Sequence, residues 1–139
     1  MKDDDFFAEA KKASPKSTCL KIQTGAVIVK DGKIVGRGDN LCSPKGFNHG
    51  QKVRACPRKN LATGDKYDLC KPLHAELVAV LNTRLEDCKG ATMYLYGHYY
   101  PCWHCESVAR FVGIKEIKCS ETEDSFYKKH NGIPRKRGG

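Results

Sequence analysis

The chain has 139 residues, of which 25 are Lys or Arg and 16 are Asp or Glu, so its formal net charge is +9. That length suits one domain with a buried core, and a hydrophobic content of 40% argues against wholesale disorder. No apolar stretch approaches the ~20 residues that a membrane-spanning helix needs, so we expect no association with a membrane.

The first residues and the cysteine content indicate the compartment. Residues 1–7 carry acidic side chains where a signal peptide has basic and then apolar ones, which predicts a cytoplasmic location. Because reducing compartments rarely sustain disulfides, the eight cysteines are expected to serve a metal or catalysis. The positive charge fits a nucleic acid, a phosphorylated substrate or a merely solvated surface.

The first half of the chain predicts a helix, a hairpin and a long loop. Residues 3–14 have acids in the first turn and a short apolar stripe, which is typical of a helix. Gly25–Lys30 is rich in β-branched residues, Asp31-Gly32 is a two-residue turn signal, and Lys33–Gly36 returns as a second strand. Residues 37–71 show no periodicity, and so long a loop inside a compact domain is usually functional or cross-linked.

The second half alternates helices with strands. Pro72 and Pro101 each open a predicted helix, since proline is tolerated in the first helical turn, and the second of these helices runs to about Val112. Strands are predicted at Ala91–Tyr96 and Ile114–Cys119. The residues that follow predict a fraying helix and a basic tail.

A strand, a helix and a strand in succession imply a parallel crossover. The sequence therefore predicts an α/β fold with a mixed β-sheet flanked by helices. The two proline-led helices would then begin at the same edge of that sheet. We predict a single domain over residues 1–127, with a cysteine-rich insertion at about 41–71, and a flexible basic tail over 128–139.

Two short motifs lie at the starts of these helices. His74-Ala75-Glu76 follows Pro72, and Pro101-Cys102-Trp103-His104-Cys105 opens the other helix. Each spacing alone is common by chance, but the two together, with a proline before the first cysteine, have a chance expectation of roughly 0.005 per chain of this composition. The combination is therefore a specific signal.

One imidazole and two thiolates suit a catalytic zinc site. His74, Cys102 and Cys105 would supply three protein ligands for Zn²⁺ and leave the fourth tetrahedral position to water. Zinc acidifies that water, and Glu76 would lie beside the metal without ligating it and move a proton to a leaving amine. The alternative is a structural Cys₃His site that uses one further cysteine.

With these motifs the chain resembles the zinc-dependent cytidine and deoxycytidylate deaminase superfamily, from Cys19 to about Cys119. Thr24–Gly32 is similar to the family's first hairpin, Gly38-Asp39-Asn40 to its Gly-x-Asn segment, and Gly90–Tyr94 to its central strand. Within the superfamily, deoxycytidylate (dCMP) deaminases are most similar, through Ser43–Gly46, Cys56–Arg58, and Gly64, Tyr67 and Cys70 ahead of His74-Ala75-Glu76.

The resemblance implies a cytidine-deaminase-like three-layer sandwich and a hydrolytic reaction. The reaction would remove the 4-amino group of dCMP to give dUMP and ammonia. The resemblance also implies zinc on His74, Cys102 and Cys105, and a proton shuttle at Glu76. The chain departs from the family's pattern at two places. Val78 stands where the family often has Asn, which bears on nucleotide specificity, and the segment before Pro101 is longer than the family's, so the pocket wall differs there.

Substrate contacts are implied at four further positions. Asn40 would hydrogen-bond the sugar, although it also suits an ordinary turn. Gly25 and Ala26 of the hairpin, and His98 ahead of the cysteines, are predicted to bind substrate, although His98 also suits a polar strand edge. A monophosphate would attract basic side chains, and the candidates are Lys21, Lys45 and Arg58.

The long loop is a candidate for a second metal. Some dCMP deaminases carry an additional structural zinc in this insertion, and His49 resembles one of its ligands. We predict a second zinc on His49, Cys56 and Cys70, with Cys42 or another group as the fourth ligand, because a metal would order so long a loop. Buried free thiols are the alternative.

Two other functions compete with the nucleotide deaminase. The same zinc motif serves deaminases of tRNA adenosine or single-stranded cytosine, and a chain of charge +9 could bind phosphates. The other competing function is that of a non-catalytic, zinc-stapled nucleic-acid-binding module, but a module of that kind would leave the presence of Glu76 unexplained. The basic residues are not interleaved with aromatics, which favours the nucleotide. Family members are commonly multimeric, so we also predict a homo-oligomer.

Overall fold

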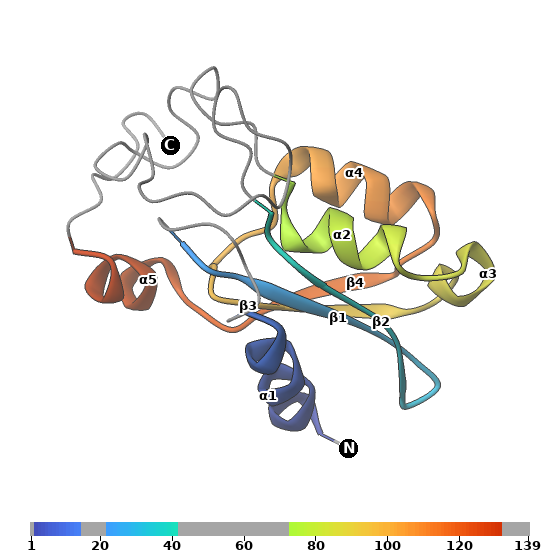
Figure 1. Ribbon diagram of the computed structural model, residues 1–139, viewed down its shortest axis with the longest axis horizontal. Helices are drawn as coiled ribbons and strands as arrows, with labels where there is room; N and C mark the ends of the chain where they lie inside the picture. Colours follow the sequence, from blue (N-terminus) through green and yellow to red (C-terminus); the bar gives the residue numbers. More distant parts are fainter. Residues whose placement is uncertain (1, 15–21, 42–72, 132–139) are drawn as a thin grey trace.

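The computed structural model describes residues 2–14, 22–41 and 73–131. Within these residues, four strands form one sheet and five helices accompany it (Figure 1). In chain order the elements are α1 (Asp3–Ala13), β1 (Gly25–Lys30), β2 (Lys33–Asp39), α2 (Ala75–Leu81), α3 (Leu85–Cys88), β3 (Thr92–Tyr96), α4 (Trp103–Phe111), β4 (Glu116–Cys119) and α5 (Glu123–Lys129). None of the described helices has the length and hydropathy needed to cross a membrane.

The sheet is mixed, as the sequence predicts. Its strand order is β2-β1-β3-β4, with β1 antiparallel to both neighbours and β3 parallel to β4. The parallel pair is joined through α4, which is the predicted crossover. Because β1 runs against the others, its first residues lie at the same edge as the last residues of β2, β3 and β4. We call this edge the site edge.

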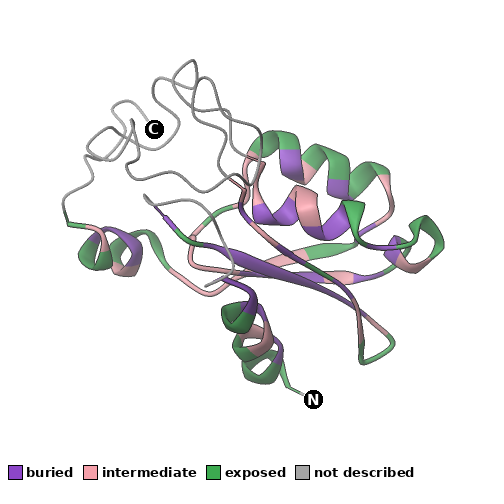
Figure 2. Cartoon of the chain, viewed as in Figure 1, coloured by how far each residue is buried: buried purple, intermediate pink, exposed green. Residues whose placement is uncertain are grey.

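The sheet lies between two helical layers. Helix α1 covers one face, α2 and α4 cover the other, and α5 lies beside the site edge (Figure 1). The two central strands, β1 and β3, are largely buried, whereas the edge strands β2 and β4 are more exposed (Figure 2). In β1, Ala26 and Ile28 pack toward α2, whereas Val27 and Val29 pack toward α1, as the two-residue period of a strand requires. The predicted three-layer α/β fold is thereby confirmed.

Helix α1 is attached to the outer face of the sheet by polar contacts and ring contacts. The hydroxyl of Tyr94 donates to Asp3 Oδ1 at 2.6 Å, and Lys118 Nζ donates to Asp3 Oδ2 at 2.7 Å. These two donors hold the pKa of the Asp3 carboxyl below its usual value. Phe6 and Phe7 both contact the Tyr94 ring, with centroids 5.1 Å apart in each case. Helix α1 therefore depends on Tyr94 in the central strand β3.

Small residues let α2 approach the sheet closely. Gly36 and Gly38 of β2 face α2, where Ala75 and Ala79 are fully buried. A Cβ on Gly38 would overlap the backbone nitrogen of Ala79 and lie 2.6 Å from the carbonyl oxygen of Ala75. Any side chain at residue 38 would therefore push α2 away from the sheet.

The structure corrects several predicted boundaries. Strand β2 ends at Asp39, beyond the predicted end at Gly36, because its last glycines pack against a helix rather than forming a loop. Helix α2 begins at Ala75 with His74 as its N-cap, three residues after Pro72, and α4 begins at Trp103 rather than Pro101. The short helix α3 was not predicted.

The segment after Cys119 also differs from its prediction. Instead of fraying, α5 buries Phe126 and Tyr127 against Ile22 and Tyr99. It ends at Lys129, two residues past the expected domain boundary. The rest of the tail, 132–139, lies outside the described residues, as does most of the predicted insertion. The residues that flank the insertion, Leu41 and Leu73, exchange two backbone hydrogen bonds of 2.8 Å.

Gly38→Ala tests the close packing of α2. The added methyl group meets backbone atoms of α2, so we expect the free energy of unfolding to fall by about 1–3 kcal/mol. Urea denaturation measures the change. Lys33→Ala, at an exposed position of the same strand, is the control and should stay within about 0.5 kcal/mol of the parent. Equal stability of the two variants would contradict the packing described here.

Candidate active site

The first motif lies where α2 begins. His74 is the N-cap residue of α2 and has an extended backbone, and its side chain makes no capping hydrogen bond. Glu76 follows in the first turn and is 5% exposed. The direct packing of α2 on β2 sets the position of both side chains at the site edge.

The second motif lies where α4 begins. Cys102 is the N-cap residue and Cys105 lies in the first turn, where it is 5% exposed. Cys105 Sγ lies 3.5 Å from His74 Nδ1. The ligand atoms of His74, Cys102 and Cys105 all lie within 4.8 Å of one another. The structure therefore brings together three side chains that lie up to 31 positions apart in the sequence.

This geometry fits zinc. Zinc bonds of 2.0–2.1 Å to nitrogen and 2.3 Å to sulfur, at a tetrahedral angle, place the two atoms about 3.5 Å apart. His74 Nδ1 and Cys105 Sγ have that separation. Within the described part of the chain, no fourth His, Cys, Asp or Glu joins the cluster. Three protein ligands and an open position are typical of a catalytic rather than a structural zinc site.

Glu76 lies beside this cluster. The backbone N–H of Cys102 donates to Glu76 Oε2 at 3.3 Å, which links the first turn of α2 to the start of α4. A buried carboxylate next to a metal site is suited to moving protons, because it is held in place and shielded from bulk water. The expected side-by-side arrangement of carboxylate and ligands is therefore present in the geometry.

Burial sets the protonation of Cys105. Removal from water raises the pKa of the Cys105 thiol, and the negative charge of Glu76 raises it further. Zinc binds the thiolate form, so metal binding would release this proton and zinc affinity would fall as the pH falls.

The residues predicted to contact substrate lie at or near the site edge. Asn40 Oδ1 accepts from the backbone N–H of Thr24 at 2.9 Å, and Asn40 Nδ2 donates to the carbonyl of Ile22 at 2.6 Å. Gly25 packs against α1, where a Cβ would overlap the carbonyl oxygen of Ala10. Ala26 is fully buried in the core. These contacts account for all three residues structurally, whether or not they also bind substrate.

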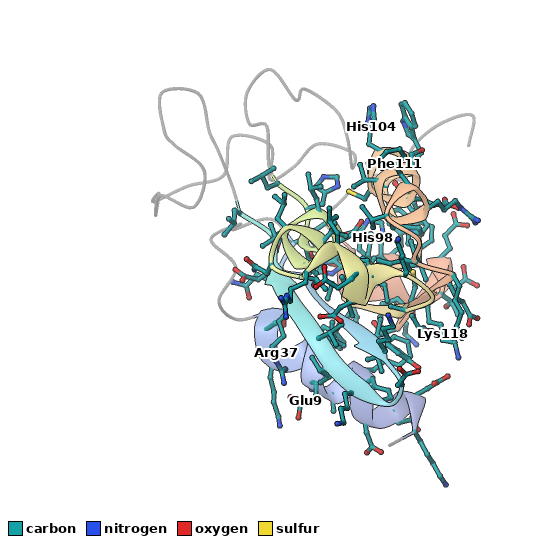
Figure 3. All side chains as sticks on the ribbon, turned by 90° about the vertical axis from the view of Figure 1, so that its right-hand side faces the viewer. Glu9, Arg37, His98, His104, Phe111 and Lys118 are labelled. Atoms are coloured by element: carbon teal, nitrogen blue, oxygen red, sulfur yellow. The ribbon has the colours of Figure 1, made fainter. Side chains whose placement is uncertain are left out.

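His98 lies in the connection from β3 to α4, four residues before Cys102 (Figure 3). Burial lowers its pKa to about 4, with smaller contributions from the charges of His74 and His130. His98 is therefore neutral at physiological pH and lies close enough to His74 to sense its charge.

The remaining predicted site residues lie outside the described residues. They are the phosphate candidates Lys21, Lys45 and Arg58, and the second-metal candidates Cys42, His49, Cys56 and Cys70. One contact was missed from the sequence: Phe126 of α5 lies against His98, with ring centroids 4.5 Å apart. The signal for it is the apolar pair Phe126-Tyr127, which lies one turn after a helix start at Thr122, where Thr122 and Ser125 cap each other.

Comparison with known proteins shows the family of this chain. A family model, the cytidine and deoxycytidylate deaminase zinc-binding region, matches residues 1–121. The chain belongs to this family. Among its relatives, the deoxycytidylate deaminase of Mycobacterium phage D29 is 31% identical over 83% of this chain and 91% of that protein.

Longer relatives show the same resemblance. The deoxycytidylate deaminases of Schizosaccharomyces pombe and Homo sapiens are 34% and 35% identical over 82% and 81% of this chain. The matched regions span only 35% and 60% of those two proteins.

Solved structures share the fold. The apo dCMP deaminase of cyanophage S-TIM5 matches with a TM-score of 0.58 and 21% identity over 98% of this chain and all of that one. A second match is a Thermotoga maritima protein named as a diaminohydroxyphosphoribosylaminopyrimidine deaminase and reductase. Its TM-score is 0.56, over 96% of this chain and 35% of that one. These likenesses support the cytidine-deaminase-like α/β fold.

Cys105→Ala tests the metal site. Loss of one of three protein ligands should lower the zinc content by one equivalent per chain relative to the parent, because two ligands hold zinc poorly. Mass spectrometry of the metals in freshly purified protein measures it. Cys88→Ala is the control: Cys88 is fully buried in the core away from the cluster, so this variant should keep the zinc content of the parent. Equal zinc in both variants would contradict the assignment.

Proposed function

We propose that the protein is a zinc-dependent hydrolase that converts dCMP and water to dUMP and ammonia. The observation that carries this proposal is the cluster of His74, Cys102 and Cys105 with the buried carboxylate of Glu76 beside it. The names of the relatives support dCMP as substrate, and the phage D29 relative is matched over nearly its whole length.

The three ligands would hold the metal, and Glu76 would move protons. When bound by His74, Cys102 and Cys105, zinc supplies a Lewis acid that lowers the pKa of water in its open position. In the net reaction a C–O bond forms at C4 of the cytosine ring and the C–N bond to the amine breaks. Glu76 takes a proton from the water and delivers it to the departing nitrogen, which leaves as ammonia.

The contacts of Glu76 suit this role. Its Oε2 accepts the backbone N–H of Cys102, so the carboxylate is oriented by an amide that is too weak an acid to take part in the proton transfer. Burial on the first turn of α2 keeps bulk water from competing for the transferred proton. A site built only to hold zinc would have no need of this carboxylate.

Substrate recognition is proposed at the site edge. The buried side chain of Asn40, fixed by its hydrogen bonds to Thr24 and Ile22, would hydrogen-bond the sugar. Gly25 and Ala26 would line the pocket through the start of β1, and His98 would line it through the connection to α4. Lys21, Lys45 and Arg58 remain the candidates for the phosphate.

The charges of the described residues favour a nucleotide over a nucleic acid. Many of the described cations pair with carboxylates, as in Arg37 with Glu9 (Figure 3), Arg110 with Glu106, and Lys129 with Glu121. A cation paired within the chain contributes less to phosphate binding than a free one, because the carboxylate already neutralises it. Nucleic-acid deamination therefore stays the second candidate.

A substrate panel tests the proposal. Purified protein should deaminate dCMP, seen as loss of cytosine absorbance with release of ammonia, and should act more slowly on CMP, deoxycytidine, tRNA and single-stranded DNA. Turnover of the polymers without turnover of dCMP would overturn the proposed substrate.

Glu76→Ala in the same assay separates proton transfer from metal binding. We expect turnover of dCMP to fall at least about 100-fold, the usual lower range for loss of a general acid–base group, while zinc content stays at the parent level. Glu106→Gln removes a half-buried carboxylate of α4 that pairs with Arg110 and serves as the control, with activity near the parent. Zinc loss in Glu76→Ala would contradict the assigned role.

We also propose a second, structural zinc on His49, Cys56 and Cys70, with Cys42 or another group completing it. The support is the donor types and the pairing of Leu41 with Leu73, which brings together the two residues that flank the insertion. The parent should therefore contain two zinc ions per chain, and Cys56→Ser should contain one. A single zinc per chain in freshly purified, unchelated parent would contradict the second site.

Self-association is the third part of the proposal. Phe111 is 92% exposed, and Trp103, Leu81 and Leu85 are each more than 60% exposed, all on α2, α3 or α4. Figure 3 shows Phe111 and His104 on the side of α4 that faces away from the sheet. Large exposed apolar side chains often mark protein interfaces.

The charges on this layer favour a second copy of the chain as the partner. Arg84 pairs with Glu86, and Arg110 pairs with Glu106, so the ions that flank the apolar residues neutralise one another. Two chains of net charge +9 could therefore meet at this layer with little repulsion.

Analytical ultracentrifugation tests self-association. The parent should sediment at twice the mass of the chain or more, and Phe111→Glu should shift the equilibrium toward the monomer, because it places a charge among apolar side chains. Lys12→Glu, on α1 at the opposite face of the sheet, should leave the mass unchanged. A monomeric parent at micromolar concentration would contradict this part of the proposal.

A further inference from the structure

The connection between β3 and α4 begins at a fixed point. Gly97 has a φ of +97°, and a Cβ there would lie 2.7 Å from the carbonyl oxygen of Gln23, so glycine is required. Its N–H donates to Ser120 Oγ at 3.0 Å, and the N–H of Ser120 donates to the carbonyl of Leu95 at 2.9 Å. The residue that follows, His98, therefore leaves the sheet from a defined position.

Hydrogen bonds set the tautomer of His98. Its Nδ1 accepts the backbone N–H of Tyr99 at 2.9 Å and that of Tyr100 at 3.4 Å. A neutral imidazole that accepts at Nδ1 carries its proton on Nε2. Among the described residues, every hydrogen bond of His98 falls on Nδ1. The Nε2–H is thus a donor that the described chain does not use.

This tautomer also keeps His98 from binding the metal. The lone pair of Nδ1 accepts two backbone N–H groups. Nε2 is protonated and therefore has no in-plane lone pair for a metal. Neither nitrogen offers a ligand to zinc, although His98 lies close enough to His74 to sense its charge. This tautomer leaves the fourth coordination position of the metal to water, and it leaves His98 with an N–H group that can donate a hydrogen bond.

Aromatic rings fix the plane of His98. The ring of Phe126 lies against it with centroids 4.5 Å apart, Tyr99 stacks at 5.1 Å, and Tyr100 meets it edge-on at 4.6 Å. Phe126 is fully buried and belongs to α5. Rotation of the imidazole would require one of these rings to move.

Helix α5 has a fixed position of its own. Its N-cap Thr122 and Ser125 exchange hydrogen bonds of 2.9 and 3.1 Å. Lys129 pairs with Glu121 at 2.8 Å, where the Glu121 side chain is 8% exposed. Together with the burial of Phe126, these contacts make α5 a rigid support for the β3–α4 connection.

We propose that α5 is part of the active site: Phe126 holds the ring of His98 so that its Nε2–H donates a hydrogen bond to an oxygen of the nucleotide substrate. This inference rests on the proposed deaminase function. His98 is the group that contacts substrate, and Phe126 is a positioning residue that acts through it. The C-terminal helix thereby sets the affinity for substrate without touching the metal or its ligands.

Two substitutions of His98 separate its two nitrogens. His98→Asn keeps an acceptor in the place of Nδ1 but lacks the donor, so the KM for dCMP should rise about three- to tenfold, with kcat and zinc content near the parent. His98→Gln restores an amide N–H in the place of Nε2 and should recover part of the loss. An unchanged KM in His98→Asn would overturn the assignment.

Comparison of substrates identifies the oxygen. If His98 binds the phosphate, His98→Asn raises the KM for dCMP and leaves that for deoxycytidine unchanged. If it binds an oxygen of the sugar or the base, both values of KM rise by the same factor. Either result supports the hydrogen bond.

Phe126→Leu tests the positioning role. It should lower the Tm and also raise the KM for dCMP about threefold, because His98 gains freedom to rotate. Ile114→Ala, a large-to-small change in the core at the opposite edge of the sheet, should lower the Tm without changing the KM. A Phe126→Leu variant with lower Tm and the KM of the parent would show that α5 has only a structural role.

A measurement without turnover separates this inference from the proposed function. Long-range proton–nitrogen NMR of the zinc-loaded protein should show His98 as the neutral Nε2–H form, and Phe126→Leu should broaden its signals. A neutral Nδ1–H form would overturn the inference even if the enzyme is active. A parent that neither binds nor deaminates dCMP would instead overturn the proposed function and leave the tautomer as measured.

Discussion

The site depends on one packing constraint, the direct contact of α2 with β2. Gly36 and Gly38 present no side chains to the helix, and Ala75 and Ala79 present only methyl groups. The helix therefore rests on the backbone of the strand, and its first turn is fixed at the site edge. Because α4 crosses between the parallel strands β3 and β4, its first turn reaches the same edge. His74 and Cys105 meet there as a consequence of backbone geometry.

The chemistry of the site edge depends on the exclusion of water as well as on the ligands that lie there. Glu76 and Cys105 are each 5% exposed, so charge on either is poorly solvated and favours a neighbouring cation. A zinc ion bound by one imidazole and two thiolates satisfies that requirement and keeps an open position. His98 lies close by, yet its Nδ1 accepts two backbone N–H groups and its Nε2 carries the proton, so neither nitrogen is a ligand for the metal. Catalytic rather than structural zinc is the outcome that these contacts favour.

The sequence predicted the parts of the fold that are local and the motifs that are rare. The hairpin at Asp31-Gly32, the crossover through α4 and the convergence of two helix starts are confirmed, because turn chemistry and hydrophobic periodicity report them directly. The end of β2 and the role of α5 were misread. Glycines that serve close packing resemble a loop in sequence, and a short helix shows its burial only when its tertiary partners are known.

We infer that three protein ligands and a separate carboxylate meet at one metal position. Anomalous diffraction at the zinc edge from crystals of the zinc-loaded protein tests it most directly. We expect a zinc peak within about 2.0–2.3 Å of His74 Nδ1, Cys102 Sγ and Cys105 Sγ, with the carboxylate of Glu76 nearby but unbound. Ligation of the zinc ion by Glu76, or by a fourth protein side chain in place of water, would contradict this inference.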